Sequence, residues 1–230
     1  MGTSPDDLKR MAALDAVRMV EDGMVVGLGT GSTVRYALFE ISRRIEEEEL
    51  SIVGIPTSRG TEDLAVELGI PLSNLMEHPK IDIDIDGADE VDPRLDVIKG
   101  GGGAHVREKV VAVSSEVLVI IADGSKLSDR IGTKSPVPVE VLPIAMPVVS
   151  TSLEDLGGTP ELRVTAGGNP FLSDNGNNIV DCRFGPIGNP AQLEGDIKSI
   201  TGVVDSGIFS GLAGIAIIAT DAGTQEIRRD

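Results

Sequence analysis

The chain has 230 residues, with 37 acidic and 20 basic residues and a formal net charge of −17 at pH 7. This length accommodates one large domain or two modest ones, and it is enough to bury roughly 70 to 75% of the unfolded surface. Because phosphate backbones are bound by basic patches, the acidic composition argues against a nucleic-acid partner. The acidic excess also predicts adaptation to a salt-rich cytoplasm, where screening reduces self-repulsion.

Neither a membrane protein nor a disulfide-bonded secreted protein is indicated. No apolar run is long enough to cross a bilayer, and the N-terminal segment is polar and helix-like. Cys182 is the only cysteine, so no intramolecular disulfide can form. We therefore expect a cytoplasmic protein without a membrane partner. With two histidines and one cysteine, a zinc site is poorly supported.

In chain order, apolar runs alternate with small-residue loops and amphipathic segments. The predicted helices lie at 8–20, 32–45, 61–68 and from 104 onward, and the predicted strands lie at 24–28, 50–55, 81–85 and 117–122. This alternation predicts an α/β fold with a Rossmann-like, doubly wound and mostly parallel sheet. Ligands bind at the carboxyl ends of the strands in such a sheet.

The pattern changes after Lys134, where prolines bracket short β-branched runs. Short strands at 162–164 and 179–181, joined through a turn at 173–177, predict a smaller antiparallel α+β domain. A buried strand at 215–219 then returns to the first domain. The expected division is a Rossmann-like catalytic domain over 1–132, a small α+β domain inserted in the C-terminal half over 133–205, and a return to the catalytic domain over 206–230.

A first glycine-rich loop at 27–33 lies between a predicted strand and a predicted helix. Helix N-terminal N–H groups favour an anion there, and the hydroxyls of Ser32 and Thr33 reinforce that preference. The dinucleotide fingerprint is incomplete, because its sixth position is Ser32 and the next strand ends without an acidic residue. A small phosphate group remains as the expected ligand, and a plain helix-entry turn is the alternative.

The strand predicted at 81–85 alternates isoleucine with aspartate, which gives it one aliphatic face and one face of carboxylates. A strand covered on both faces should not alternate in this way, so solvation of Asp82 and Asp84 at a sheet edge stays an open interpretation. Asp86 and Asp89 instead follow the carboxyl end of the strand, where ligands bind. A turn built on Asx side chains is the alternative.

A second glycine segment, KGGGGAHVREK at 99–109, follows this acidic cluster. Four glycines have no side chain to bury, which favours close approach of backbone to a ligand over a packing role. Glu108 is expected in the second turn of a helix whose N-terminus points at the site. A carboxylate is favoured over His105 as the proton carrier, although a surface glutamate is the alternative for Glu108 taken alone. Lys99 and Lys126 each follow a predicted strand, so they are either surface lysines or partners of an oxyanion or phosphate.

Five motifs, in this order, resemble the ribose-5-phosphate isomerase family of the A type. They are GTGST at 29–33, DGADE at 86–90, KGGGGAxxxEK at 99–109, ADGSK at 122–126 and DNGN at 174–177. The resemblance implies interconversion of D-ribose 5-phosphate and D-ribulose 5-phosphate, in the non-oxidative branch of the pentose phosphate pathway, with no metal and no cofactor. It also implies a homodimer or homotetramer.

The same resemblance implies roles for individual residues. Glu108 would be the base, Asp86 would assist ring opening, and Asp89 and Lys99 would steady the intermediate. An enediolate fits this inventory, because one carboxylate can take the proton from one carbon and return it to the next. The implied substrate-binding residues are Thr30, Gly31, Ser32, Thr33, Asp86, Gly87, Ala88, Asp89, Lys99, Gly100, Gly101, Gly102 and Lys126.

Two other classes of function stay open from the sequence. A non-catalytic sugar-phosphate sensor would keep the first glycine loop but would not need Glu108, Asp86 and Lys99 together. A related enzyme, such as an amino-sugar phosphate deaminase or a coenzyme A transferase, could share the sheet and a glycine loop.

Overall fold

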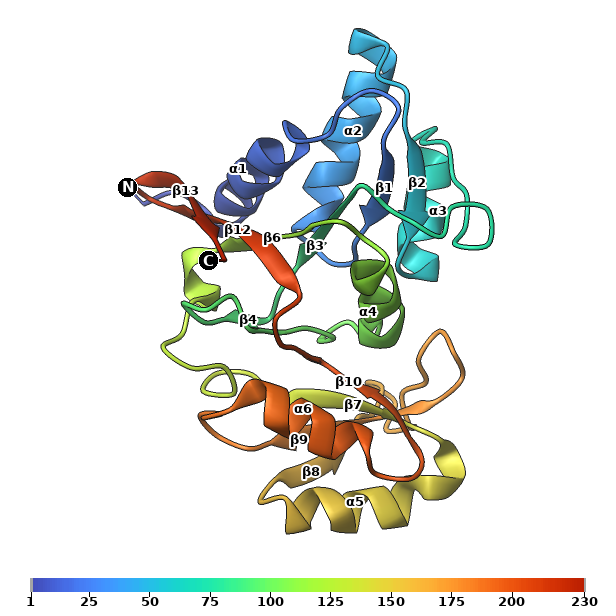
Figure 1. Cartoon of the computed structure of the whole chain (residues 1–230), viewed down its shortest axis with the longest axis vertical. Coiled ribbons are helices and arrows are strands. Elements are labelled where there is room, and N and C mark those ends of the chain that lie inside the picture. The colour runs from blue at the N-terminus through green and yellow to red at the C-terminus, as the bar shows by residue number, and fades with distance from the viewer. Residues whose placement is uncertain (1, 230) are drawn as a thin grey trace. The chain divides into compact units, whose positions relative to one another are not determined.

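A computed structural model describes residues 2–229, and Figure 1 shows the course of the chain. The chain separates into two compact units. The first unit comprises Met1–Ala88, Arg107–Lys126 and Leu212–Asp230, and the second comprises Asp89–Val106 and Leu127–Gly211. Within the described residues, no helix has the length and apolar character needed to cross a bilayer.

The boundaries of the two compact units differ from the domain boundaries predicted from the sequence. Residues 89–106, expected in the first domain, belong to the second unit. Their short strand at 97–98 pairs with a strand at 208–209 of that unit, and their other short strand, at 90–91, pairs with the one at 97–98. Residues 1 and 230, at the outer ends of the expected catalytic domain, lie outside the described residues. The correspondence between compact units and independently folding domains stays a prediction.

The first unit is built on a six-stranded sheet of order β13-β12-β6-β3-β1-β2. Its strands are β1 Val25–Leu28, β2 Val53–Pro56, β3 Ile83–Gly87, β6 Leu118–Asp123, β12 Ala213–Thr220 and β13 Gly223–Arg228. All neighbours pair in parallel except β13, which is antiparallel to β12 at the edge. Each strand predicted for the catalytic domain overlaps one of these, and the predicted α/β class with a mostly parallel sheet is confirmed.

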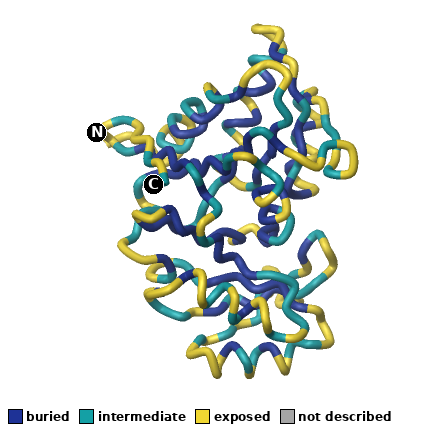
Figure 2. The backbone as a smooth tube through the Cα atoms, viewed as in Figure 1, coloured by how far each residue is buried: buried dark blue, intermediate teal, exposed yellow. Residues whose placement is uncertain are grey.

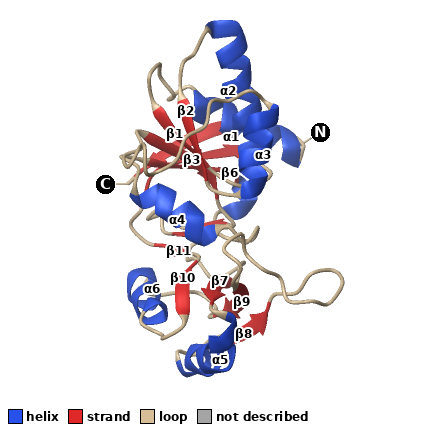
Figure 3. Ribbon diagram, turned by 90° about the vertical axis from the view of Figure 1, so that its right-hand side faces the viewer, coloured by secondary structure: helices blue, strands red, loops and turns tan. Residues whose placement is uncertain are grey.

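Helices cover both faces of this sheet, and they are α1 Pro5–Val17, α2 Val34–Glu48, α3 Arg59–Glu67 and α4 His105–Val113. α1, α2 and α3 pack on one face, against alternate strand residues such as Val26, Ile85 and Val119. α4 packs on the opposite face (Figure 3). There the side chain of Val111 lies against Gly27. Every residue of β6 is consequently buried (Figure 2), as expected for a strand covered on both faces.

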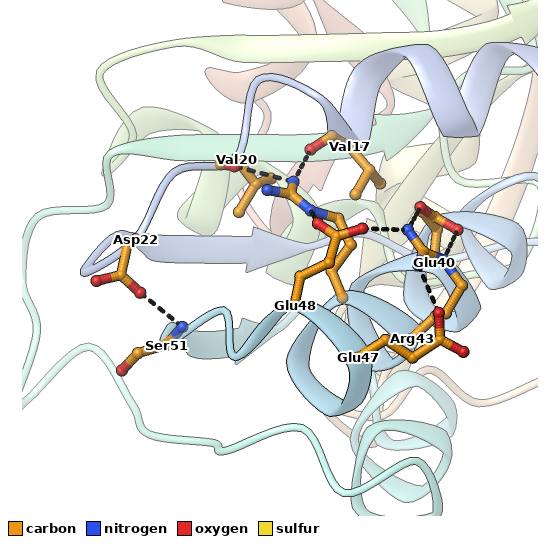
Figure 4. Close-up of polar contacts among 9 residues, drawn as sticks. Val17, Val20, Asp22, Glu40, Arg43, Glu47, Glu48 and Ser51 are labelled. Carbon is orange, nitrogen blue, oxygen red and sulfur yellow. Dashed lines mark hydrogen bonds and ion pairs between the residues drawn. The ribbon is translucent and has the colours of Figure 1, made fainter.

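An ion network joins α1 to α2 at the acidic run 46–49 (Figure 4). The guanidinium of Arg43 donates hydrogen bonds to Glu40, Glu47 and Glu48. Arg44 donates to the carbonyl oxygens of Val17, the last residue of α1, and of Val20, which lies just beyond that helix. The hydrogen bond from Arg43 lowers the pKa of Glu40 below its usual value. Arg44 therefore ties the end of α1 to α2, whereas the hydrogen bonds from Arg43 to the glutamates stay within α2.

The second unit holds two antiparallel sheets, of order β10-β7-β9-β8 and β11-β5-β4. Its strands are β4 Glu90–Val91, β5 Val97–Ile98, β7 Val137–Val141, β8 Thr159–Leu162, β9 Asn178–Arg183, β10 Val203–Ser206 and β11 Ile208–Phe209. Its helices are α5 Met146–Asp155 and α6 Pro190–Lys198, with the 3-10 helix η2 Pro143–Ala145; a second one, η1 Gly124–Lys126, belongs to the first unit. Antiparallel strands with two helices give the smaller α+β architecture that the sequence predicts.

Candidate active site

The strand order of the first unit reverses between β1 and β3. The chain passes from β1 to β2 on one side and later enters β3 on the other. Loops diverge at such a switch point and leave room for a ligand. Residues 30–33 follow β1, Asp86 and Gly87 end β3, Ala88 comes directly after it, and Lys126 closes η1 beyond β6. The structure thus brings these predicted residues to neighbouring strand ends of the first unit.

Asp86 is fully buried and lies directly against the first glycine loop. Its Oδ1 accepts the N–H of Thr30 at 3.0 Å and the N–H of Gly87 at 2.7 Å. A Cβ on Gly29 would lie 2.3 Å from this oxygen and 2.6 Å from the Cα of Asp86, so no larger residue fits there. The contact between Gly29 and Asp86 fixes the carboxylate at the mouth of the loop.

The N-terminus of α2 retains backbone donors. Thr33 is the N-cap residue, but its side chain makes no capping hydrogen bond. Within residues 2–229, the amides of 31–34 donate no hydrogen bond to another residue. Unsatisfied N–H groups and the positive end of the helix dipole together favour an anion. The ammonium of Lys126, at the end of η1, also has no hydrogen-bonded or ionic partner in the described part of the chain.

A cluster of hydroxyl groups supports the same loop. Thr30 Oγ1 lies 2.7 Å from Thr57 Oγ1, 2.8 Å from Ser58 Oγ and 3.1 Å from Thr61 Oγ1. Ser58 also caps α3 by accepting the N–H of Thr61. A hollow of about 230 Å³ lies at these two helix N-termini and is lined in part by Thr30, Ser58 and Thr61. Sequence reasoning missed Thr57 and Ser58, although a serine just before a helix is an N-cap signal.

The carboxylates of β3 face α4. Asp84 is fully buried in a strand that lies between β1 and β6, so the interpretation of a solvated edge is wrong for this residue. Its side chain points to the same face of the sheet as Asp86, two residues on. Glu108 is 4% exposed and lies one turn before Val111, so it occupies the sheet-facing side of α4. Because α4 begins at His105, Glu108 is in the first turn instead of the expected second.

The remaining predicted residues belong to the second unit. Asp89 Oδ2 accepts the N–H of Gly101 at 2.7 Å. Lys99 is almost fully buried, with its Nζ 5.6 Å from the centre of the Phe209 ring. A cation over an aromatic face is stabilised by the ring quadrupole, so this contact favours the charged form of Lys99.

Packing within the second unit explains three glycines of the second segment. A Cβ would lie 2.7 Å from His105 Cβ at Gly100, 2.7 Å from Asp89 Oδ1 at Gly101, and 2.6 Å from Phe171 Cε1 at Gly103. Gly100 also has a φ of 101°, which side chains rarely adopt. The expectation that packing cannot account for these glycines is therefore wrong, since the partners come from residues that the local sequence does not reveal.

The DNGN motif has a structural role in the second unit. Glu140 is fully buried in β7, and its Oε1 accepts hydrogen bonds from Asn175 Nδ2 at 3.0 Å and Asn177 Nδ2 at 2.7 Å. A buried carboxylate needs such donors, because an unpaired one would be strongly destabilising. The two asparagines thereby anchor the turn at 173–177 to the sheet.

These features define the class of the protein. A switch point with open helix N-terminal amides, hydroxyls and buried carboxylates is typical of an α/β enzyme that acts on a small anionic ligand. Within residues 2–229, no group of three His, Cys, Asp or Glu side chains has an arrangement that could hold a metal ion.

Comparison with known proteins identifies the family. The family model for ribose 5-phosphate isomerase A, also called phosphoriboisomerase A, matches residues 53–223. Ribose-5-phosphate isomerase A of Synechococcus sp. (strain JA-3-3Ab) is 47% identical over 98% of this chain and 99% of its own length. The chain therefore belongs to the ribose 5-phosphate isomerase A family and is an isomerase.

Solved structures agree with this assignment. Ribose 5-phosphate isomerase A from Methanocaldococcus jannaschii is 43% identical, with a TM-score of 0.94 over 98% of this chain and all of that one. A D-ribose-5-phosphate isomerase solved in complex with phospho-erythronic acid is 38% identical, with a TM-score of 0.97 over 99% of this chain and all of that one. Among the functions left open by the sequence, these matches favour the isomerase over the sensor, the deaminase and the transferase.

Proposed function

We propose that this enzyme interconverts D-ribose 5-phosphate and D-ribulose 5-phosphate through an enediolate, with Glu108 as the proton carrier. The observation that carries the proposal is the placement of Glu108, a buried carboxylate on the α4 side of the sheet, the side to which Asp86 also points. In the open-chain aldose, Glu108 takes the proton from C2 and returns it to C1, while the C2 hydroxyl proton moves to the oxygen on C1. Asp86 assists the preceding ring opening by proton transfer at the ring oxygen.

The phosphate group is assigned to the first glycine loop. The amides of 31–34, the hydroxyls of Ser32 and Thr33 and the ammonium of Lys126 supply hydrogen bonds and positive charge to a dianion. Thr30, whose hydroxyl is bonded to Thr57, Ser58 and Thr61, fixes the shape of the loop. Binding the phosphate converts binding energy into orientation of the reacting carbons.

The negative charge that develops on the substrate oxygens needs donors. We assign this role to Lys99 and to the backbone of Gly100, Gly101 and Gly102, with Asp89 holding the glycine segment through its bond to Gly101. Gly87 and Ala88 contribute backbone that contacts the sugar. A single oxyanion donor is typically worth about 10²- to 10³-fold in rate. Phospho-erythronic acid carries a carboxylate where the enediolate would be, so we expect it to bind this chain as well.

The proposal is tested by isomerisation in heavy water. Wild-type enzyme should convert ribose 5-phosphate to a ketose that carries solvent deuterium at C1, because the proton on Glu108 exchanges with solvent. Glu108→Gln should bind substrate but turn over about 10²-fold or more slowly. Glu116→Gln, an exposed position shortly after α4, is the matched control and should retain full activity. Near-normal turnover by a folded Glu108→Gln variant would remove Glu108 from this role.

We also propose a cytoplasmic homodimer or homotetramer adapted to high salt. Support for assembly comes from Leu142, Ile144 and Val148 at η2 and α5 of the second unit, which are apolar and exposed by 45, 90 and 61%. Sedimentation of wild type and Ile144→Glu tests the assembly, since a monomeric wild type would refute it. The −17 charge supports salt adaptation, and unchanged thermal stability between dilute buffer and 2 M KCl would contradict that part.

A further inference from the structure

Arg163 binds the second glycine segment through two hydrogen bonds, although it lies 63 residues away from Gly100 in the chain. Its Nη1 donates to the carbonyl oxygen of Gly100 at 2.9 Å and to that of Gly101 at 3.1 Å. All of these residues belong to the second unit. A charge-assisted bond to each of two consecutive carbonyls fixes both peptide planes.

The guanidinium is itself firmly held. Its Nε and Nη2 donate to the two carboxylate oxygens of Asp181 at 2.8 and 2.5 Å, and the side chain of Arg163 is 14% exposed. It also stacks 5.7 Å from the centre of the Phe171 ring, the same ring that touches Gly103. The backbone of Arg163 continues the pairing of β8 with β9 through its N–H to Ile179. The cation therefore has little freedom to move.

The geometry of the peptide bond determines where the N–H groups of this segment point. In a trans peptide the C=O and the following N–H point in opposite directions. The N–H of Gly101 lies opposite the Gly100 carbonyl that binds Arg163, and it does bond to an anionic oxygen, that of Asp89. The N–H of Gly102 lies opposite the Gly101 carbonyl in the same way. Within residues 2–229 this amide donates to no other residue, and Gly102 is exposed.

We propose that Arg163, braced by Asp181, is a positioning residue that aims the N–H of Gly102 at the oxyanion of the enediolate. The inference deepens the proposed function, because it rests on the glycine segment being the oxyanion donor. Arg163 touches no reacting atom. It binds the carbonyl oxygens of Gly100 and Gly101 and so fixes the orientation of the N–H groups of Gly101 and Gly102. The first of these N–H groups bonds to Asp89, and the second is left for the substrate.

The first test separates rate from binding. Arg163→Ala should lower kcat for ribose 5-phosphate by about 10²-fold, the loss expected when a donor is displaced by about 1 Å, and should change KM by less than about threefold. Added guanidinium should restore part of the lost kcat, whereas ammonium at the same concentration should not, since it lacks the planar fork. Arg183→Ala, an exposed arginine on β9, is the matched control and should keep wild-type kcat. A folded Arg163→Ala variant with kcat within threefold of wild type would overturn the proposal.

The second test observes the amide itself. In protein labelled with ¹⁵N-glycine, the Gly102 amide proton of wild type should move downfield when phospho-erythronic acid binds, and it should move much less in Arg163→Ala. An equal shift in both proteins would refute the role of Arg163 but leave the oxyanion donor in place. No shift in wild type, with binding shown by calorimetry, would refute the donor role in the proposed function. If Arg163→Ala does not fold, Arg163→Lys and Asp181→Asn serve in both tests, with smaller expected losses of kcat.

Discussion

The two glycine-rich segments look alike in sequence but are held by different means. The first, at 27–33, takes its shape from neighbouring secondary structure, with β1 before it, α2 after it and the adjoining strand β3 supplying Asp86. In the second, the glycine run at 99–103 lies in no helix or strand and is held by the side chains of Asp89, Phe171 and Arg163. Backbone N–H donors can therefore be held in position in two ways. Either they belong to the N-terminus of a helix, or distant side chains bind the carbonyl oxygens of the same peptide groups.

The largest expected effect breaks the first segment. Gly29→Ala places a Cβ within 2.6 Å of the backbone of Asp86, which cannot move without shifting β3. We expect a loss of about 3 kcal/mol in the free energy of unfolding, the upper range for an overpacked site, together with loss of turnover. Urea unfolding of the full chain measures it. A loss below about 1 kcal/mol would mean that the two strands are loosely joined.

A second variant weakens the second unit away from the candidate site. Asn177→Ala removes one of the two amides that bond to the buried carboxylate of Glu140. A buried polar group left under-satisfied costs about 1 to 3 kcal/mol, so we expect a loss near 2 kcal/mol. Thermal unfolding measures this loss. The neighbouring Asn178→Ala is the control, and an equal loss there would show that the bonds to Glu140 contribute nothing special.

A third variant sharpens the contrast between the two glycine loops. Gly101→Ala also creates a short contact, 2.7 Å, but the atom it meets is the end of the Asp89 side chain, which can rotate away. The expected loss of stability is therefore only about 1 kcal/mol, the lower end for overpacking. Turnover should still fall, because Asp89 would release the Gly101 amide. Comparison with Gly29→Ala in the same urea titration is decisive, and equal losses would contradict the assignment of rigid and yielding neighbours.

The smallest effect uses Cys182 as a reporter of the second unit. Burial raises the pKa of this thiol to about 12, from 9.0 when free. The unfolded thiol therefore loses its proton at lower pH than the folded one, and stability should decline as pH rises from about 9 towards 12. At pH 8.5, iodoacetamide should label native protein slowly. Asn177→Ala should speed labelling, because it weakens the unit that buries the thiol.

Local sequence predicted much of the first unit. Alternating apolar runs and glycine stops located its strands and helices, and the glycine loop at 27–33 correctly predicted a helix N-terminus. The anion site at that N-terminus stays a prediction. Asp84 was harder to place, because the same alternation fits a solvated edge strand and a central strand whose carboxylates face a helix. Only the pairing of β3 with both β1 and β6 distinguishes them.

The sequence by itself determined the alternation of strands and helices, the glycine turns and the chemical types of the candidate site residues, since each depends on residues a few positions apart. Tertiary structure decided which carboxylates are buried and why three of the four consecutive glycines are required. It also decided that Arg163 and Asp181 hold a segment more than 60 residues earlier in the chain. The physical reason is that burial and hydrogen-bond partners come from elements adjacent in space, and local periodicity carries no information about those neighbours.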